Sequence, residues 1–450
     1  MQHRGRTGLD LSLVHDGSGE VPAIQYPGGG WDLRPHAARV LAIDEGVLLS
    51  WAQLFDEPGT APDEARLLRP VSRADLEALE VLAAAPLRLA DHRYSWTSGF
   101  HEKGAKEDGT IRWDTQVPVS WDEAILQGPH FTVANPFAKQ PNDGCRSNKD
   151  YSAWDLERLP GRPIPRTNYQ RACNRDTYEA AIDHWHGRPS TSYWRHIHRE
   201  MTQPGLERSV QGALLPPGPA HIHACLTYTF ELRTLARFAG LMASIPVDYV
   251  FKVSGAGHVA EHQLNRLPLP DAGPFDSALL LRTLRLNCLT ADYAPLWAEL
   301  WDPAWRQDAW TDPVSDRPLL GAVEPAWSMA TPLRTDYDRR MALVELDALA
   351  ALMLGLSAEQ LCAMYGTQFP VLRKYEYSMA FDARGRKIAK DHQAAGVRQE
   401  KGDWDLVAAW MDDPSSVEVP DRYQSPFVRP DREKEMTRAW EEFARRAGQA

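Results

Sequence analysis

The segment from 162 to 208 concentrates side chains that could bind an anionic partner. Arginines outnumber acidic residues there, and five aromatic side chains lie among them: Tyr169, Tyr178, Trp185, Tyr193 and Trp194. Guanidinium groups pair well with phosphate and carboxylate groups, and such binding follows a local patch rather than the total charge. The formal net charge of -11 therefore argues against a nucleic-acid-binding surface over the whole protein, but it allows a local basic face.

Three pairs of histidines could in principle bind a metal ion. Each pair has one residue between its members, a spacing that points both side chains the same way only on a strand. No pair of thiolates or carboxylates with matching spacing accompanies them, as a zinc site would require. We interpret these histidines as surface or hydrogen-bonded residues and predict no metal site at His184/His186, His196/His198 or His221/His223.

The sequence lacks the usual catalytic motifs. Gly255 and Gly257 have no helix-opening context of the kind a cofactor loop needs. Asn135-Pro136-Phe137 is one proline short of the loop with which amino-methyltransferases hold a flipped base. The sequence also contains no carboxylate and lysine cluster of a metal nuclease, no P-loop, no Gly-x-Ser-x-Gly and no HExxH. We predict no catalytic residue in this chain.

The sequence predicts an α+β fold from the helices and strands that must position these residues. In the first part, short apolar runs alternate with turn signals, and prolines interrupt residues 125–141. Asp108-Gly109 predicts a tight hairpin turn. We therefore expect a loop-rich mixed β region, followed by a mainly helical C-terminal part.

The middle of the chain is apolar and predicts buried helices. Residues 230–245 have helical spacing and stop at Pro246, whereas residues 247–254 fit either a strand or a helix. Ser277 is the expected N-cap of the next buried helix. Between these segments, Leu267–Pro270 reads Leu-Pro-Leu-Pro, which predicts an extended and stiff strut because proline fixes φ and restricts the residue before it.

The last hundred residues carry the clearest helix boundaries. Gly355 ends one predicted helix, and Ser357 with Gln360 forms a capping box at the start of the next. Asp431 can cap a final amphipathic helix, whose last turn carries basic side chains.

The apolar runs and the cysteines indicate the cellular compartment. No apolar run is long enough to cross a bilayer, and the first residues lack the apolar core of a signal peptide. The five cysteines are scattered and form no CxxC pair. This usage is typical of a reducing compartment, so we expect a cytoplasmic protein without membrane contact.

Several blocks occur in an order that resembles a known family. The first block, Tyr193–Gly218, is followed by "GLMASIPVDYVFKV", by the strut, and by the helix pair over 345–361. In this order they resemble the target-recognition half of Eco57I-like (type IIG) restriction-modification enzymes. "GGWDLRPH" and "QFPVLRKYE" resemble adenine-specific methyltransferases of BREX- and DISARM-type phage defence. The first block carries the family pattern with Arg195, Arg199, Glu207, Arg208, Leu214, Leu215, Pro216 and Gly218.

The resemblance implies a specificity module that lacks its catalytic half. The N-terminal methyltransferase part of the family, which binds S-adenosylmethionine, has no counterpart in this sequence, so the chain resembles a split subunit or a truncated gene. It implies double-stranded DNA and a methyltransferase subunit or module as partners, with adenine N6 as the methylated atom. We expect a DNA target-recognition region over 1–275 and a helical region over 276–450, with no cofactor bound by this chain.

The resemblance also implies which side chains contact DNA. Arginine suits guanine, and asparagine or glutamine suits adenine, while other basic side chains neutralise phosphates. Two alternatives stay open, a protein-binding scaffold and a divergent metal-dependent nuclease. The expected base-reading residues are Arg166, Asn168, Gln170 and Arg171, and the expected phosphate contacts are Arg195, Arg199, Arg208 and Lys252.

Overall fold

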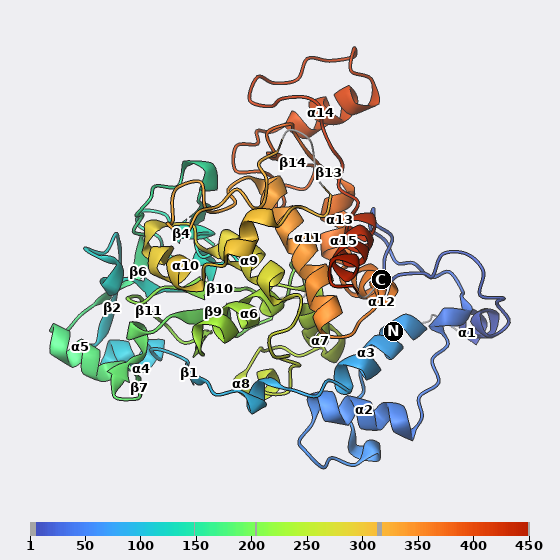
Figure 1. Ribbon diagram of the computed structural model, residues 1–450, viewed down its shortest axis with the longest axis horizontal. Helices are drawn as coiled ribbons and strands as arrows, with labels where there is room; N and C mark the ends of the chain where they lie inside the picture. Colours follow the sequence, from blue (N-terminus) through green and yellow to red (C-terminus); the bar gives the residue numbers. More distant parts are fainter. Residues whose placement is uncertain (1–5, 148, 203–204, 313–316, 449–450) are drawn as a thin grey trace.

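The computed structural model describes residues 6–147, 149–202, 205–312 and 317–448, and its fold is α+β, as predicted (Figure 1). A group of N-terminal helices comes first, and the second and third of them pack against each other. Among the described residues, no helix is both long and apolar enough to span a membrane. The N-terminal helices are α1 (Arg6–Leu13), α2 (Glu45–Phe55) and α3 (Arg73–Ala83).

The β region contains two four-stranded sheets. The first is antiparallel with strand order β1-β12-β9-β10, and the second has the order β11-β3-β6-β2, in which β11 and β3 are parallel. The region also contains two two-stranded sheets, β4 with β5 and β7 with β8. The bounds are β1 (Ser95–Thr97), β2 (Ile111–Gln116), β3 (Ile125–Leu126), β4 (Lys139–Pro141), β5 (Tyr151–Ala153), β6 (Thr167–Arg171), β7 (His184–Trp185), β8 (Arg188–Pro189), β9 (Arg195–Arg199), β10 (Gly212–Leu215), β11 (Ala220–His221) and β12 (Cys225–Thr229), with the short helices α4 (Glu102–Glu107) and α5 (Arg175–Ala181) beside them.

Alternation along the strands of the first sheet explains how it is buried on both faces. Leu214 belongs to the core shared with the helices, whereas its neighbours Ala213 and Leu215 pack with residues of the second sheet. Successive side chains of a strand point to opposite faces, so one strand serves both layers. The opposite face of the second sheet packs on α4 and α5. There, Tyr169 of β6 lies in one cluster of buried side chains with Tyr178 of α5.

The helical part packs on the first sheet and forms the main core. Figure 1 shows α6 beside β9 and β10, and α9 and α11 pack on α6, with α12 and α15 further out. Helices α6 and α9 pack against each other, and α11 contacts α9 and α15. The bounds are α6 (Leu232–Met242), α7 (Ile245–Ser254), α8 (Glu261–Leu264), α9 (Asp276–Asn287), α10 (Ala294–Leu300), α11 (Asp336–Met353), α12 (Ala358–Gln368), α13 (Pro370–Tyr377) and α15 (Arg432–Arg446).

The main core passes across the boundary expected at 275/276. Leu235 and Tyr249 precede that position, whereas Leu279 and Leu346 follow it, and all four belong to one cluster of buried side chains. Helices α3 and α7 also pack on α12. The N-terminal and central helices therefore share their core with the C-terminal helices.

Two local predictions were wrong. Asp108-Gly109 does not close a hairpin: residues up to Glu107 form α4, Gly109 has a φ of +80°, and β2 pairs with the distant β6. Ser277 is not an N-cap, because α9 begins one residue earlier after Phe275 and the Ser277 hydroxyl donates to Asp302 instead, at 2.9 Å. In both cases a tertiary partner outweighed a local signal.

The ambiguous segment after Pro246 is helical. Proline lies in the first turn of α7, where its missing N–H is not needed, and Gly255 ends the helix with a φ of +65°. The Leu-Pro strut is extended, as predicted: the Leu89 amide donates to the Leu267 carbonyl at 2.9 Å, and the Leu269 amide donates to Leu87 at 3.1 Å.

The capping signals of the C-terminal helices are confirmed. Ser357 accepts from the Gln360 amide while the Gln360 side chain accepts from the Ser357 amide. Gly355 has a φ of +76°, and Asp431 caps α15 through the Lys434 amide.

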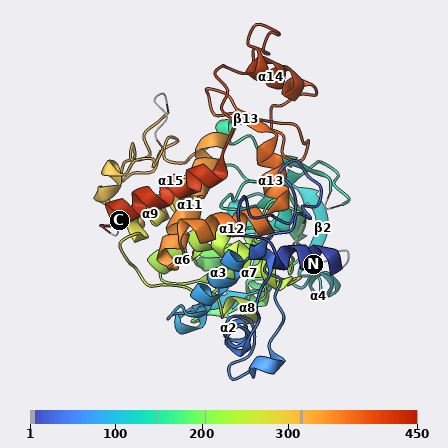
Figure 2. The ribbon, with the colours of Figure 1, turned by 90° about the vertical axis from the view of Figure 1, so that its right-hand side faces the viewer.

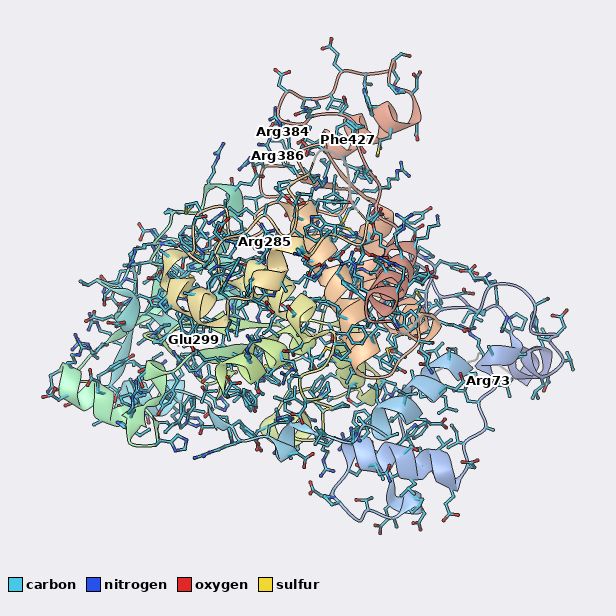
Figure 3. All side chains as sticks on the ribbon, in the orientation of Figure 1. Arg73, Arg285, Glu299, Arg384, Arg386 and Phe427 are labelled. Atoms are coloured by element: carbon cyan, nitrogen blue, oxygen red, sulfur yellow. The ribbon has the colours of Figure 1, made fainter. Side chains whose placement is uncertain are left out.

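A segment between α13 and α15 projects from the body in both Figure 1 and Figure 2. It contains β13 (Met379–Phe381), β14 (Lys387–Ala389) and α14 (Asp403–Asp412). It has a small core of its own, which includes Ile388, Val407 and Tyr423. Figure 3 places Arg384, Arg386 and Phe427 near its base.

Candidate functional site

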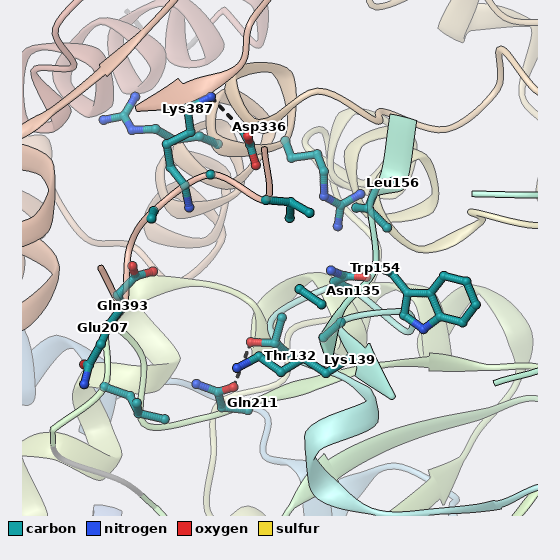
Figure 4. Close-up of a pocket in the computed structure, with 18 of the residues that line it drawn as sticks. Thr132, Asn135, Lys139, Trp154, Leu156, Glu207, Gln211, Asp336, Lys387 and Gln393 are labelled. Carbon is teal, nitrogen blue, oxygen red and sulfur yellow. Dashed lines mark hydrogen bonds between the residues drawn. The ribbon is translucent and has the colours of Figure 1, made fainter. Parts of the chain in front are cut away.

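A large open cavity lies where the β region meets the C-terminal helices. Its volume is about 910 Å³, and its lining comes from residues 127–157, 199–224 and 334–432. In the close-up of Figure 4, Lys387 and Asp336 lie on one side, and Thr132, Gln211 and Lys139 lie on the opposite side. Segments that are far apart in the sequence thus build one site.

Uncompensated positive charge distinguishes this cavity. Its lining includes ten lysines and arginines but only five acidic side chains, although the chain as a whole is acidic. Six of these cations make no ion pair with a carboxylate of any residue that the structure describes, since their hydrogen bonds go to carbonyl or sulfur atoms or are missing. They are Lys139, Lys149, Arg199, Arg334, Arg339 and Lys387.

The three arginines of this group are held rigidly by the backbone. Arg339 donates to the carbonyls of Leu286, Leu333 and Ala134, each at 2.9 Å. Burial lowers the pKa of Arg339 to about 10, and it also lowers the pKa of Arg199 and of Arg334. The lowered pKa values mean that these charges are poorly compensated, so an anion in the cavity would stabilise them.

The remaining cations of the lining are neutralised within the fold. Arg340 and Arg432 both bind Glu376, and Arg398 binds Asp155. These pairs join the helices to the β region and to the projecting segment. They shape the walls of the cavity, while the six uncompensated cations set its charge.

An amide network forms one part of the wall. The Gln127 Oε1 atom accepts hydrogen bonds from Asn168 Nδ2 and from the Tyr151 hydroxyl, both at 3.0 Å. Asn168 Oδ1 in turn accepts from the Thr115 hydroxyl at 2.9 Å. Gln127 and Tyr151 line the cavity, and Asn168 lies behind them, fully buried.

The four residues expected to read bases lie along β6 or next to it. Asn168 and Gln170 are buried, and the Gln170 amide donates to the Thr167 hydroxyl and carbonyl. Arg166 donates to the Pro141 carbonyl at 3.1 Å, and Arg171 forms an ion pair with Glu123 at 2.9 Å. Their polar groups are used largely inside the sheet, and none of the four lines the cavity.

The four residues expected to contact phosphates are spread over three places. Arg195 is 1% exposed and donates to the Pro219 carbonyl, with its pKa lowered to about 9 by burial. Arg208 is buried against Asp347, and Lys252 lies over the Phe369 ring at 5.0 Å, with a pKa that burial lowers. Arg199 alone of the eight expected residues lines the cavity.

These placements change how three of the residues are interpreted. Asn168, Arg195 and Arg208 have their polar groups inside the fold, because tertiary contacts that the sequence does not reveal cover them. We therefore assign them to support of the fold and no longer to direct DNA contact. Of the other five, Gln170 is also buried, with 6% of its surface exposed. The remaining four are partly exposed: Arg166, Arg171, Arg199 and Lys252.

Sequence reasoning missed Gln127, Lys139, Lys149 and Lys387. Lys139 lies in the proline-rich turn after Asn135, and Lys387 lies some 250 residues further on. Only the packing of the projecting segment against the β region brings them together. The basic composition of 162–208 does not point to this cavity, since most arginines there donate to carbonyls or pair with carboxylates and Arg199 alone of them lines it.

The histidine pairs do not form a metal centre among the residues that the structure describes, where no group of three or more potential ligands converges. His196 and His198 lie on the same face of β9, as their spacing allows, with ring centroids 5.9 Å apart. Burial lowers the pKa of His198 to about 4 and that of His221 to about 3, so both are neutral at pH 7.

Comparison of the sequence with models of known protein families gives no match, and comparison with curated proteins gives none either.

Proposed function

We propose that this chain is the DNA sequence-recognition part of a restriction-modification or phage-defence adenine-N6 methyltransferase, and that it binds DNA through the basic cavity. The observation that carries the proposal is the excess of uncompensated cations in one cavity of an acidic protein. Phosphates are the natural ligands of such a site, because binding them releases counterions and compensates buried guanidinium charge.

The type of cation in the cavity also supports this assignment. Lys139 and Lys149 are exposed, whereas Arg199, Arg334 and Arg339 are fixed by carbonyl groups. Mobile ammonium groups suit a polymer whose phosphates vary in position, and fixed guanidinium groups suit a defined register.

The methyltransferase part of the proposal rests on the order of the sequence blocks that resemble type IIG enzymes. Because the sequence contains no cofactor loop and no Asn-Pro-Pro-aromatic motif, methyl transfer from S-adenosylmethionine is assigned to a separate subunit or module. The present chain would select the site and the partner would modify adenine there.

A binding selection tests the proposal. The purified chain is incubated with random DNA duplexes at near-physiological salt, and the bound fraction is recovered and sequenced. We expect a short enriched word. No enrichment, together with no salt-dependent retention of DNA, would overturn the proposal.

A second assay separates recognition from catalysis. The purified chain is incubated with the enriched duplex and S-adenosylmethionine carrying a labelled methyl group. We expect binding of the duplex without transfer of label. Transfer by the chain alone would show that it is itself a methyltransferase and would contradict the assignment.

A further inference from the structure

Gln127 presents one oriented hydrogen-bond donor to the cavity. Its Oε1 atom is occupied by Asn168 and Tyr151. Its Nε2 atom makes no hydrogen bond with any residue in the described part of the chain, yet that atom is not fully buried, and the residue lines the cavity. The side chain as a whole is only 4% exposed, so a ligand must enter the cavity to reach it.

The hydrogen bonds of Thr115 and Asn168 favour the end of the Gln127 amide that faces the cavity. The Thr115 hydroxyl donates to Asn168 Oδ1 at 2.9 Å, a shorter contact than the 3.3 Å to the Cys145 carbonyl, and in this arrangement the Asn168 amino group points toward Gln127. That amino group also donates to the Tyr151 hydroxyl at 2.9 Å, which leaves the Tyr151 proton for Gln127 Oε1. With Asn168 in this orientation, a flipped Gln127 would set its own amino group against that of Asn168, and leaving buried polar groups unpaired costs about 1–3 kcal/mol.

The size of the cavity limits what can reach this donor. A volume of about 910 Å³ lies within the range of small-ligand sites, which is roughly 300–1,000 Å³. A single nucleotide fits such a space, whereas a double helix does not. A base can therefore meet Gln127 only after it has left the stack, as happens in proteins that extrude a nucleotide from DNA.

We propose that the cavity takes one unstacked nucleotide of the bound DNA, and that Gln127 selects a base with a carbonyl oxygen at its major-groove edge, which is guanine or thymine. This inference rests on the proposed function and deepens it. The Nε2 donor pairs with O6 of guanine or O4 of thymine, whereas adenine and cytosine place an amino group at the same position. Lys139, Lys149 and Lys387, which line the same cavity, bind the phosphates on either side of the nucleotide.

The substitution Asn168→Asp tests the selectivity because it inverts the network. A carboxylate at this position accepts from Thr115, from Tyr151 and from Gln127 Nε2, so the Gln127 amide turns over and shows Oε1 to the cavity. The random-duplex selection is then run on both proteins. We expect one position of the enriched word to change from guanine or thymine to adenine or cytosine, with the other positions unchanged.

Two further variants control this result. Asn174→Asp adds the same charge outside the cavity, and its Oδ1 atom still accepts from the Thr177 amide, so the word should stay that of the unmodified chain. Gln127→Glu keeps both accepted hydrogen bonds but loses the donor, so it should lose the preference at that one position. This second variant keeps the test decisive if Asn168→Asp does not fold, as judged by thermal unfolding.

A fluorescence measurement tests separately whether the nucleotide leaves the stack. The fluorescent base 2-aminopurine has no carbonyl group, so it is placed directly beside the position that Gln127 selects, and its emission is measured with and without the protein. We expect a rise on binding, because stacking quenches this base, and no rise when the probe is two positions away. An enriched word that is identical for all variants, or an unchanged emission, would overturn the inference while leaving DNA recognition intact. Failure of the unmodified chain to enrich any word would instead overturn the proposed function.

Discussion

Arg432 and Glu376 form a two-pronged ion pair on the wall of the cavity. The guanidinium Nε lies 3.0 Å from Oε2 of Glu376, and Nη2 lies 3.0 Å from Oε1. Burial acts to raise the pKa of Glu376, but Arg340 and Arg432 together hold it at about 2. The pair joins the first residue of α15 to the end of α13, so it closes the projecting segment back onto the body.

Removing the charge of Glu376 should destabilise the fold strongly. Glu376→Gln leaves Arg340 and Arg432 buried with one less negative partner, and breaking a buried pair costs about 3–5 kcal/mol. Urea unfolding at pH 7 measures the loss. As a control, Glu102→Gln breaks the exposed pair with Lys106 and should cost less than about 1 kcal/mol. Equal effects of the two substitutions would show that the buried cluster is not special.

Neutralising the cavity lysines should weaken DNA binding at every sequence and reduce its dependence on salt. Each phosphate contact contributes about 0.9 to the slope of log affinity against log salt. The triple variant Lys139→Gln, Lys149→Gln and Lys387→Gln should therefore lower the slope by about 2 to 3. Fluorescence anisotropy over a range of salt concentrations measures it.

A variant with the same change of net charge provides the control for this prediction. Lys103→Gln, Lys106→Gln and Lys434→Gln remove three lysines that pair with Glu107, Glu102 and Asp431 outside the cavity. The slope of this control should match that of the unmodified chain. A loss of slope as large as in the cavity variant would mean that DNA responds to net charge alone.

Acid should destabilise the protein in part through its buried histidines. Burial lowers the pKa of His198 from 6.5 to about 4 in the folded state. The unfolded chain therefore takes up the proton first, so the stability is complete above pH 6.5 and is lost as the pH falls toward 4. The contribution of His198 to the loss between pH 7 and pH 4.5 should be about 2–3 kcal/mol.

Urea unfolding at the two pH values tests this. His198→Gln should unfold with a smaller difference between pH 7 and pH 4.5 than the unmodified chain. His392→Gln changes a histidine whose side chain is 90% exposed, and it should leave the difference unaltered. If both substitutions leave the pH dependence as it was, His198 is not the group that titrates.

The capping box of α12 should be worth a measurable part of the stability. Ser357→Ala removes the acceptor of the Gln360 amide, and loss of such a cap costs about 1 kcal/mol. Ser50→Ala lies inside α2, where the hydroxyl only bonds back to the Gly46 carbonyl, and it should change the stability by less than about 0.5 kcal/mol. A thermal denaturation series compares the two variants.

Local physical rules explain what could be predicted from the sequence. The fold class, the helix pair over 345–361, the final helix, the caps at Ser357 and Asp431 and the extended Leu-Pro strut follow from periodicity, capping chemistry and the fixed φ of proline. Each of these signals acts over a few neighbouring residues. Where local signals competed with distant partners, as at Asp108-Gly109 and Ser277, the prediction was wrong.

The tertiary structure alone decided which charges remain free. Eight basic or amide side chains were expected to contact DNA, and only Arg199 lines the cavity. Arginine at positions 195 and 208 could not be recognised as internal, since the Pro219 carbonyl and Asp347 that bind them lie 24 and 139 residues away. A cation attracts an anionic ligand most strongly where the fold leaves its charge without a carboxylate partner, and such partners come from anywhere in the chain, so composition alone does not locate the site.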